Sequence, residues 1–224
     1  MNNWIDYWSE ETQFVCEHHK NLSYEAIYKD LKPYISSSDR ILDFGCGEGL
    51  FSSQLSQNCR ELFLYDAAQP LLDKLRVNIS NGNIRVVNDY RDITLLNIVL
   101  ISSVSQYIPE NEFFKILKNL RSSMSPNGRI IISDIVPLKN SIFIEILDLV
   151  KISIKNGFLT QAVFKMFISM LGNYSKMRRL LPLTKYNPNI FTKNVEQLGF
   201  GFEIESHNLG LNSNRFTIVL TRRD

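Results

Sequence analysis

The chain has 224 residues, of which 44% are hydrophobic and 21% are charged. This length fits one domain, and this composition can build a sizeable core, which excludes an intrinsically disordered chain. The 25 basic and 23 acidic residues give a net charge of +2, far from the strong basic excess of a nucleic-acid-binding protein. The sequence has no run of about 18 apolar residues that could span a bilayer, and its N-terminus lacks the layout of a signal peptide. We therefore expect a cytoplasmic protein.

The three cysteines, Cys16, Cys46 and Cys59, are an odd number and have no Cys-x-x-Cys spacing. Both features argue against a disulfide framework and against a zinc ribbon, and they fit reduced thiols. The three histidines also lack the spacing of metal ligands, so we predict no bound metal.

Short β-rich runs alternate with helical patterns along most of the chain. Helices are predicted at about residues 50–57 and 70–77, and a third follows Pro109. Seven strands are predicted, at residues 40–44, 61–65, 83–87, 97–102, 129–133, 201–207 and 215–221. This alternation is typical of an α/β fold with a mostly parallel sheet, and the short segment before the last strand predicts an antiparallel C-terminal hairpin.

Two segments fall outside this alternation. Residues 1–35 have a helical pattern and are predicted to form an N-terminal helical cap. Residues 137–190 follow the fifth strand and hold two or three amphipathic helices. Connections in βα units are usually only 2–6 residues long, so we expect this helical insertion to act as a lid that covers or shapes a site. We interpret residues 1–224 as a single domain with these two additions.

A glycine-rich turn follows the first strand, with Gly45, Gly47 and Gly49 at alternate positions after Asp43. Glycine is needed where the backbone takes a positive φ or where a ligand approaches closely, and this edge of an α/β sheet is where nucleotide-like ligands bind. The dinucleotide fingerprint requires its third glycine at position 50, which is leucine, so the spacing argues against NAD or FAD. Asp66 ends the second strand, where an acid can bind ribose hydroxyls.

With these motifs the chain resembles the class I S-adenosylmethionine-dependent methyltransferases, over roughly residues 35–135 and 190–222. Asp43-x-Gly45-x-Gly47-x-Gly49 matches the first motif of the family, and Asp66 matches the acid that holds the ribose. The segments at residues 43–48, 103–107 and 134–137 are similar to a bacterial small-molecule branch. The resemblance implies a Rossmann-like seven-stranded sheet, S-adenosyl-L-methionine as cofactor and S-adenosyl-L-homocysteine as product.

The resemblance also implies which residues bind the cofactor. Asp43 is expected to bind its ammonium group directly or through water, Asp66 its ribose and Asp89 its adenine. Cys46 is expected to pack or to offer its backbone N–H, since no adjacent basic residue favours a thiolate. The full predicted cofactor-binding set is Asp43, Gly45, Cys46, Gly47, Asp66, Ala67, Asp89 and Ser102.

Three residues are candidates for catalysis. Asp134 ends the fifth strand and could act as a base, or it could be a helix cap or an ion-pair partner. Tyr107 could orient an acceptor or belong to the core, and His19 could reach the site or lie on the surface beside His18. Alignment of the acceptor with the methyl group can supply most of the rate, and a base matters mainly for a hydroxyl acceptor.

The insertion at residues 137–190 contains eight basic and only two acidic residues. This asymmetry suggests an anionic neighbour, such as an anionic acceptor or a membrane surface. The stretch at residues 158–171 is strongly apolar and a basic run follows it, as in interfacial amphipathic helices. The alternative is a lid or a dimer contact with a solvated basic face, and the sequence leaves the oligomeric state open.

Three hypotheses for the function follow. The first is a methyltransferase that acts on a small and perhaps anionic metabolite or glycan precursor, with oxygen slightly favoured over nitrogen as the acceptor. The second is a membrane-surface methyltransferase with a lipid-linked substrate, and the third is an idle cofactor-binding regulatory protein. A nucleic-acid substrate ranks below these.

Overall fold

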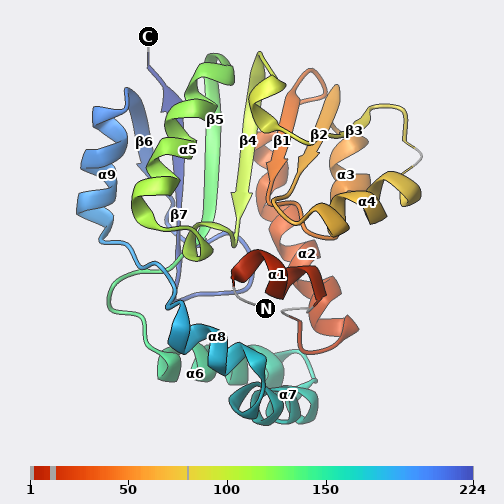
Figure 1. Ribbon diagram of the computed structural model, residues 1–224, viewed down its shortest axis with the longest axis vertical. Coiled ribbons are helices and arrows are strands. Elements are labelled where there is room, and N and C mark those ends of the chain that lie inside the picture. The colour runs from red at the N-terminus through yellow and green to blue at the C-terminus, as the bar shows by residue number, and fades with distance from the viewer. Residues whose placement is uncertain (1–2, 11–13, 80, 224) are drawn as a thin grey trace.

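The computed structural model describes residues 3–10, 14–79 and 81–223 and shows a seven-stranded sheet with the order β3-β2-β1-β4-β5-β7-β6 (Figure 1). The strands are β1 (Arg40–Phe44), β2 (Glu61–Tyr65), β3 (Ile84–Val86), β4 (Leu96–Ser102), β5 (Met124–Ile135), β6 (Phe200–Ile204) and β7 (Phe216–Arg222). Strands β1 to β5 pair in parallel, whereas β7 pairs antiparallel with both β5 and β6. The predicted Rossmann-like sheet with a C-terminal hairpin is confirmed.

Helices cover both faces of the sheet, because the buried central strands are apolar on both sides. One core cluster joins the sheet to α5 (Glu110–Ser123) and α9 (Pro188–Gln197). The other joins it to α2 (Glu17–Leu31), α3 (Ser52–Ser56) and α4 (Gln69–Asn78).

Two strands differ from their predicted bounds by more than one residue. The strand predicted at residues 201–207 ends at Ile204, because Asn208 turns inward and its Oδ1 accepts a hydrogen bond from the N–H of Asp134 at 2.9 Å. The fifth strand begins at Met124 rather than at residue 129 and ends at Ile135 rather than at residue 133, and Asn127 within it has a φ of 61°.

The two additions to the sheet lie next to each other, beyond the carboxyl ends of the parallel strands (Figure 1). The cap consists of α1 (Trp4–Glu10), α2 and the short η1 (Lys32–Tyr34), and its residues 1–2 and 11–13 lie outside the described part. The insertion forms three helices, α6 (Ile142–Lys155), α7 (Leu159–Leu171) and α8 (Asn173–Leu180). An aromatic cluster that includes Trp4 and Tyr174 joins α1 to α8.

Candidate functional site

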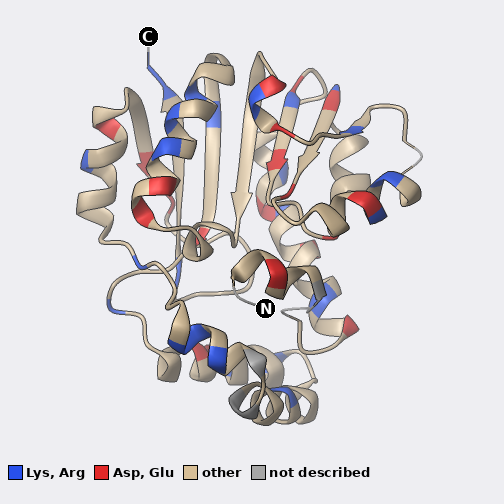
Figure 2. Cartoon of the chain, in the orientation of Figure 1, with Lys and Arg blue, Asp and Glu red and all other residues tan. Residues whose placement is uncertain are grey.

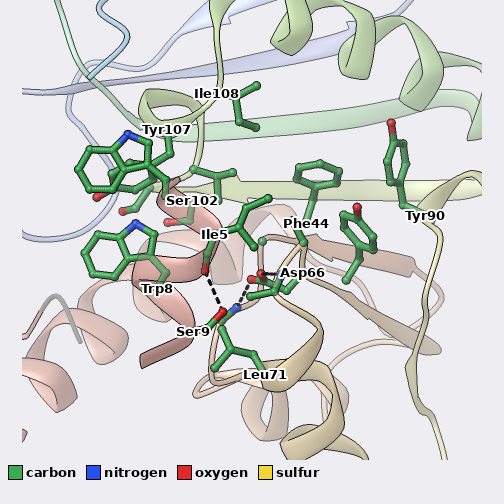
Figure 3. Close-up of a pocket in the computed structure, with 18 of the residues that line it drawn as sticks. Ile5, Trp8, Ser9, Phe44, Asp66, Leu71, Tyr90, Ser102, Tyr107 and Ile108 are labelled. Carbon is green, nitrogen blue, oxygen red and sulfur yellow. Dashed lines mark hydrogen bonds between the residues drawn. The ribbon is translucent and has the colours of Figure 1, made fainter. Parts of the chain in front are cut away.

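A cavity of about 880 Å³ opens at the carboxyl ends of β1, β2 and β4. The loops that follow these strands form much of its wall, and α1 contributes Ile5 and Trp8 from one side (Figure 3). The volume lies within the range of about 300–1,000 Å³ that small-molecule sites occupy. This edge of a parallel α/β sheet is where ligands bind, so the cavity is the candidate site.

The three glycines after β1 lack a side chain for different reasons. A Cβ on Gly45 would lie 2.3 Å from Cγ2 of Val104, and one on Gly49 would lie 2.8 Å from Cδ2 of Leu75. A Cβ on Gly47 would meet no described atom within 4 Å, and its φ of 54° is in the left-handed region. Gly47 therefore borders open space and lets a ligand lie against the backbone. Gly45 lines the cavity and has a φ of 79°, and its packing against Val104 also requires that a side chain be absent.

Asp66 follows β2 and ties the glycine loop to the next loop. Its Oδ2 accepts a hydrogen bond from the N–H of Gly47 at 2.9 Å, and its Oδ1 accepts one from the N–H of Ala68 at 2.8 Å. Each carboxylate oxygen has a further lone pair, so Asp66 can still accept hydrogen bonds from ribose hydroxyls while it holds the loop. Asp66 and Ala67 line the cavity, as does Ser102 at the end of β4.

Asp43 carries an unpaired buried oxygen close in sequence to this loop. Its side chain is buried, and its Oδ2 has no hydrogen-bond partner among the described residues. Burial and the negative charge of Asp66 raise the pKa of Asp43 to about 7. An orphaned acceptor implies a donor from outside the protein. Asp43 does not line the cavity itself, so an ammonium group would reach it past Gly45 or through a water molecule. Together with the open space at Gly47, this acceptor fits the predicted cofactor.

Two residues that are predicted to contact the cofactor form hydrogen bonds with other groups of the protein instead. The N–H of Cys46 donates to the carbonyl of Tyr65 at 3.0 Å, and burial raises the pKa of its thiol well above the ordinary value. Asp89 lines the cavity, but its carboxylate accepts hydrogen bonds from the Arg91 guanidinium at 2.9 Å, which holds its pKa at about 2. The roles of Cys46 and Asp89 toward the cofactor stay predictions.

Asp134 lies outside the cavity wall, within a buried polar network. Its Oδ1 accepts hydrogen bonds from the side-chain amides of Asn208 and Asn212 at 3.1 and 3.0 Å, and its Oδ2 accepts one from Ser103 at 2.8 Å. Arg215 forms an ion pair with it at 3.5 Å. Since these donors surround the carboxylate, the geometry favours the role of ion-pair partner for Asp134 over that of general base.

The other two catalytic candidates differ in position. Tyr107 lines the cavity, and burial raises its pKa well above the ordinary value, so it stays a phenol that can orient an acceptor. His19 is not part of the cavity wall: its ring stacks on Phe158 with centroids 5.0 Å apart, and its Nδ1 accepts from the N–H of Val15. Burial and the nearby His18 lower the pKa of His19. It belongs to the contact between cap and insertion.

Aromatic residues that the sequence analysis did not assign line two sides of the cavity. Phe44, Tyr65 and Tyr90 pack together with centroids 5.1 Å apart. Trp8 packs against Tyr107 at 5.3 Å, and Figure 3 shows this pair on the opposite side from Phe44 and Tyr90. A signal for the first group was present in the sequence, because Phe44 and Tyr65 end their strands directly before the glycine loop and Asp66.

Comparisons with known proteins agree with this geometry. A family model described as a methyltransferase domain matches residues 41–128. Carboxy-S-adenosyl-L-methionine synthase of Actinobacillus pleuropneumoniae is 23% identical over 125 residues, which are 51% of this chain and 52% of that protein. The chain matches about half or less of the length of such curated relatives.

Solved structures share the fold over nearly the whole chain. A putative methyltransferase of Haloferax volcanii, solved in a complex with the activator Trm112, has a TM-score of 0.65 at 10% identity and full coverage of both chains. The N-methyltransferase NodS of Bradyrhizobium japonicum with S-adenosyl-L-homocysteine has a TM-score of 0.57 at 11% identity and covers 98% of this chain and 97% of its own. Residues 41–128 thus match a methyltransferase-domain model, and the chain shares its fold with solved methyltransferases. Neighbours solved with S-adenosyl-L-methionine or S-adenosyl-L-homocysteine agree with the expected cofactor, and the bacterial small-molecule branch stays a prediction.

The open space at Gly47 gives a first prediction. Gly47→Val will place a branched side chain in the cavity and weaken the binding of S-adenosyl-L-homocysteine at least 100-fold in isothermal titration calorimetry. Gly157→Val is the matched control, because Gly157 also has a positive φ and open space around its Cβ position but does not line the cavity. Both variants bear a similar backbone strain of about 1–2 kcal/mol. Unchanged affinity in Gly47→Val would mean that the ligand lies elsewhere.

The raised pKa of Asp43 predicts a pH dependence of stability. Between about pH 4 and pH 7 the folded state keeps a proton that the unfolded state has lost, so the free energy of unfolding falls as the pH rises. The slope approaches about 1.4 kcal/mol per pH unit inside this window. Urea unfolding at pH 5 and pH 8 measures the difference, and Asp43→Asn will remove this component. An identical pH profile for the variant would contradict the raised pKa.

The network around Asp134 predicts a structural cost of its substitution. Asp134→Asn directs an NH₂ group toward donors and removes one of the two carboxylates that pair with Arg215, which will lower the free energy of unfolding by about 2–4 kcal/mol. Asp73→Asn is the control, since the Asp73–Arg76 pair is exposed and such pairs contribute about 0–1 kcal/mol. Urea denaturation separates the two variants. Wild-type stability of Asp134→Asn, together with lost activity, would restore Asp134 as a catalytic candidate.

Proposed function

We propose that the chain transfers a methyl group from S-adenosyl-L-methionine to a small molecule bound in the cavity. The observation that supports this most strongly is the open space at Gly47, next to the hydrogen-bonded Asp66 and the unpaired oxygen of Asp43. When bound, the cofactor supplies an electrophilic methyl group. The glycine loop and Asp66 carry the groups that would hold the cofactor, which leaves the rest of the cavity for an acceptor.

The acceptor is an oxygen nucleophile that is already anionic at neutral pH, and a carboxylate is the simplest case. Among the described residues that line the cavity there is no histidine, and the acids there lie at the glycine loop and after β2 and β3. Removal of a proton from a neutral hydroxyl therefore lacks an evident base. On the side of the cavity formed by α1, Trp8 lines the wall, and its buried Nε1–H has no hydrogen-bond partner among the described residues. An anionic oxygen would satisfy this donor.

The chemistry of the product tests this proposal. Metabolite extracts are incubated with the protein and with S-adenosyl-L-methionine labelled in its methyl group, and we expect release of S-adenosyl-L-homocysteine. Mild alkali will then release labelled methanol from the product. Methyl esters hydrolyse under these conditions, whereas N-methyl groups and methyl ethers do not. Gly47→Val will be inactive and Gly157→Val active. Labelled product without volatile methanol would contradict the carboxylate. No turnover in any extract, with intact cofactor binding, would favour the idle cofactor-binding protein.

A further inference from the structure

Helices α6 and α7 turn large apolar side chains toward solvent. Phe143, Leu147 and Ile154 of α6 are 67%, 43% and 62% exposed, and Val163, Phe164 and Phe167 of α7 are 53%, 66% and 63% exposed. We call these six residues the apolar face. Isolated exposed apolar residues are ordinary, but a contiguous group of this size marks an interaction site. Figure 2 shows both helices at one end of the molecule.

The orientation of α6 is fixed by its polar residues, which face the protein. The buried Asp148 accepts hydrogen bonds from the backbone and hydroxyl of Ser213 at 3.1 and 2.9 Å. Glu145 pairs with Arg178 at 2.6 Å and with Arg215 at 3.5 Å. Turning the apolar face inward would break these bonds and leave buried charges without partners, which would cost free energy of folding. The helix is therefore held with its apolar side outward.

The charges around the apolar face identify what covers it. The insertion has only two acidic residues, Glu145 and Asp148, and both are engaged in the contacts above. Exposed basic side chains remain on the same helices and beside them, namely Lys139, Lys151, Lys155, Lys176 and Arg179. An apolar surface edged by one sign of charge is complementary to an anionic lipid surface. A second copy docked by the same face would instead bring like charges together.

The lengths of these helices define how they would contact a bilayer. Within the described residues, none of the helices is long and apolar enough to cross a membrane. α6 has 14 residues and α7 has 13, and helices of this kind lie in the plane of the interface with their apolar side in the acyl boundary. We propose that the α6–α7 apolar face is a docking surface for anionic phospholipid membranes. This inference goes beyond the proposed function and does not depend on it.

Vesicle flotation of the whole chain tests the proposal without any assay of activity. The protein will float with vesicles of phosphatidylcholine and 30% phosphatidylglycerol at 0.15 M salt, and at least tenfold less with phosphatidylcholine alone. Higher salt will reduce binding, because it screens the basic residues. Absence of flotation with the anionic vesicles, or equal flotation with both kinds, would overturn the proposal on the native chain itself.

A pair of matched variants tests the surface. Phe164→Glu/Phe167→Glu will reduce flotation at least tenfold, since it places two acids in the apolar face. Val77→Glu/Ile204→Glu is the control, because these residues of α4 and β6 are 85% and 43% exposed and lie outside the insertion at residues 137–190. Equal loss in both variants would overturn the assignment. So would a concentration-dependent dimer in sedimentation velocity that Phe164→Glu/Phe167→Glu abolishes, since a second copy would then cover the face.

Discussion

The hydrogen bonds of the Asp66 carboxylate determine the shape of the candidate site. β1 and β2 lie side by side in parallel register, with Phe44 opposite Tyr65, so the loops that follow them leave the sheet together. Asp66 accepts one backbone N–H from each loop and holds both in place. The same negative charge acts on Asp43 and contributes to its raised pKa. The carboxylates of Asp43 and Asp66 therefore repel each other, and a ligand with a positive group would reduce this repulsion.

A second polar network fixes the position of the insertion. Asp134 joins the end of β5 to the segment before β7 through Asn208, and Arg215 connects it to Glu145 of α6. Asp134 has a φ of 65°, a conformation that costs energy for a residue with a side chain. Four donors from two separate segments, the loop after β4 and residues 208–215, surround its carboxylate, and they hold the residue there. These neighbours favour the role of ion-pair partner for Asp134, and its role in catalysis stays a prediction.

The alternation of strands and helices could be predicted from the sequence because it depends on local apolar patterns. The glycine motif and Asp66 could also be predicted, since each lies within a few residues of its strand. The network of Asp134 could not, because Asn208 is 74 residues away and an asparagine carries no signal for its partner. The same holds for Gly45, whose need for a missing side chain comes from Val104. Local periodicity likewise gave the helices of the insertion but not which side of α6 faces the protein.

The aromatic cluster between α1 and α8 connects the two parts of the molecule that carry the proposals. The ring centroid of Trp4 lies 4.9 Å from that of Tyr107 in the cavity wall and 6.1 Å from that of Tyr174 of α8. Arg178, one turn along α8, lies over the ring of Tyr174 and pairs with Glu145 of α6. Close-packed side chains of this kind shift as units rather than one at a time. A continuous chain of contacts therefore connects α6 of the insertion to the wall of the cavity.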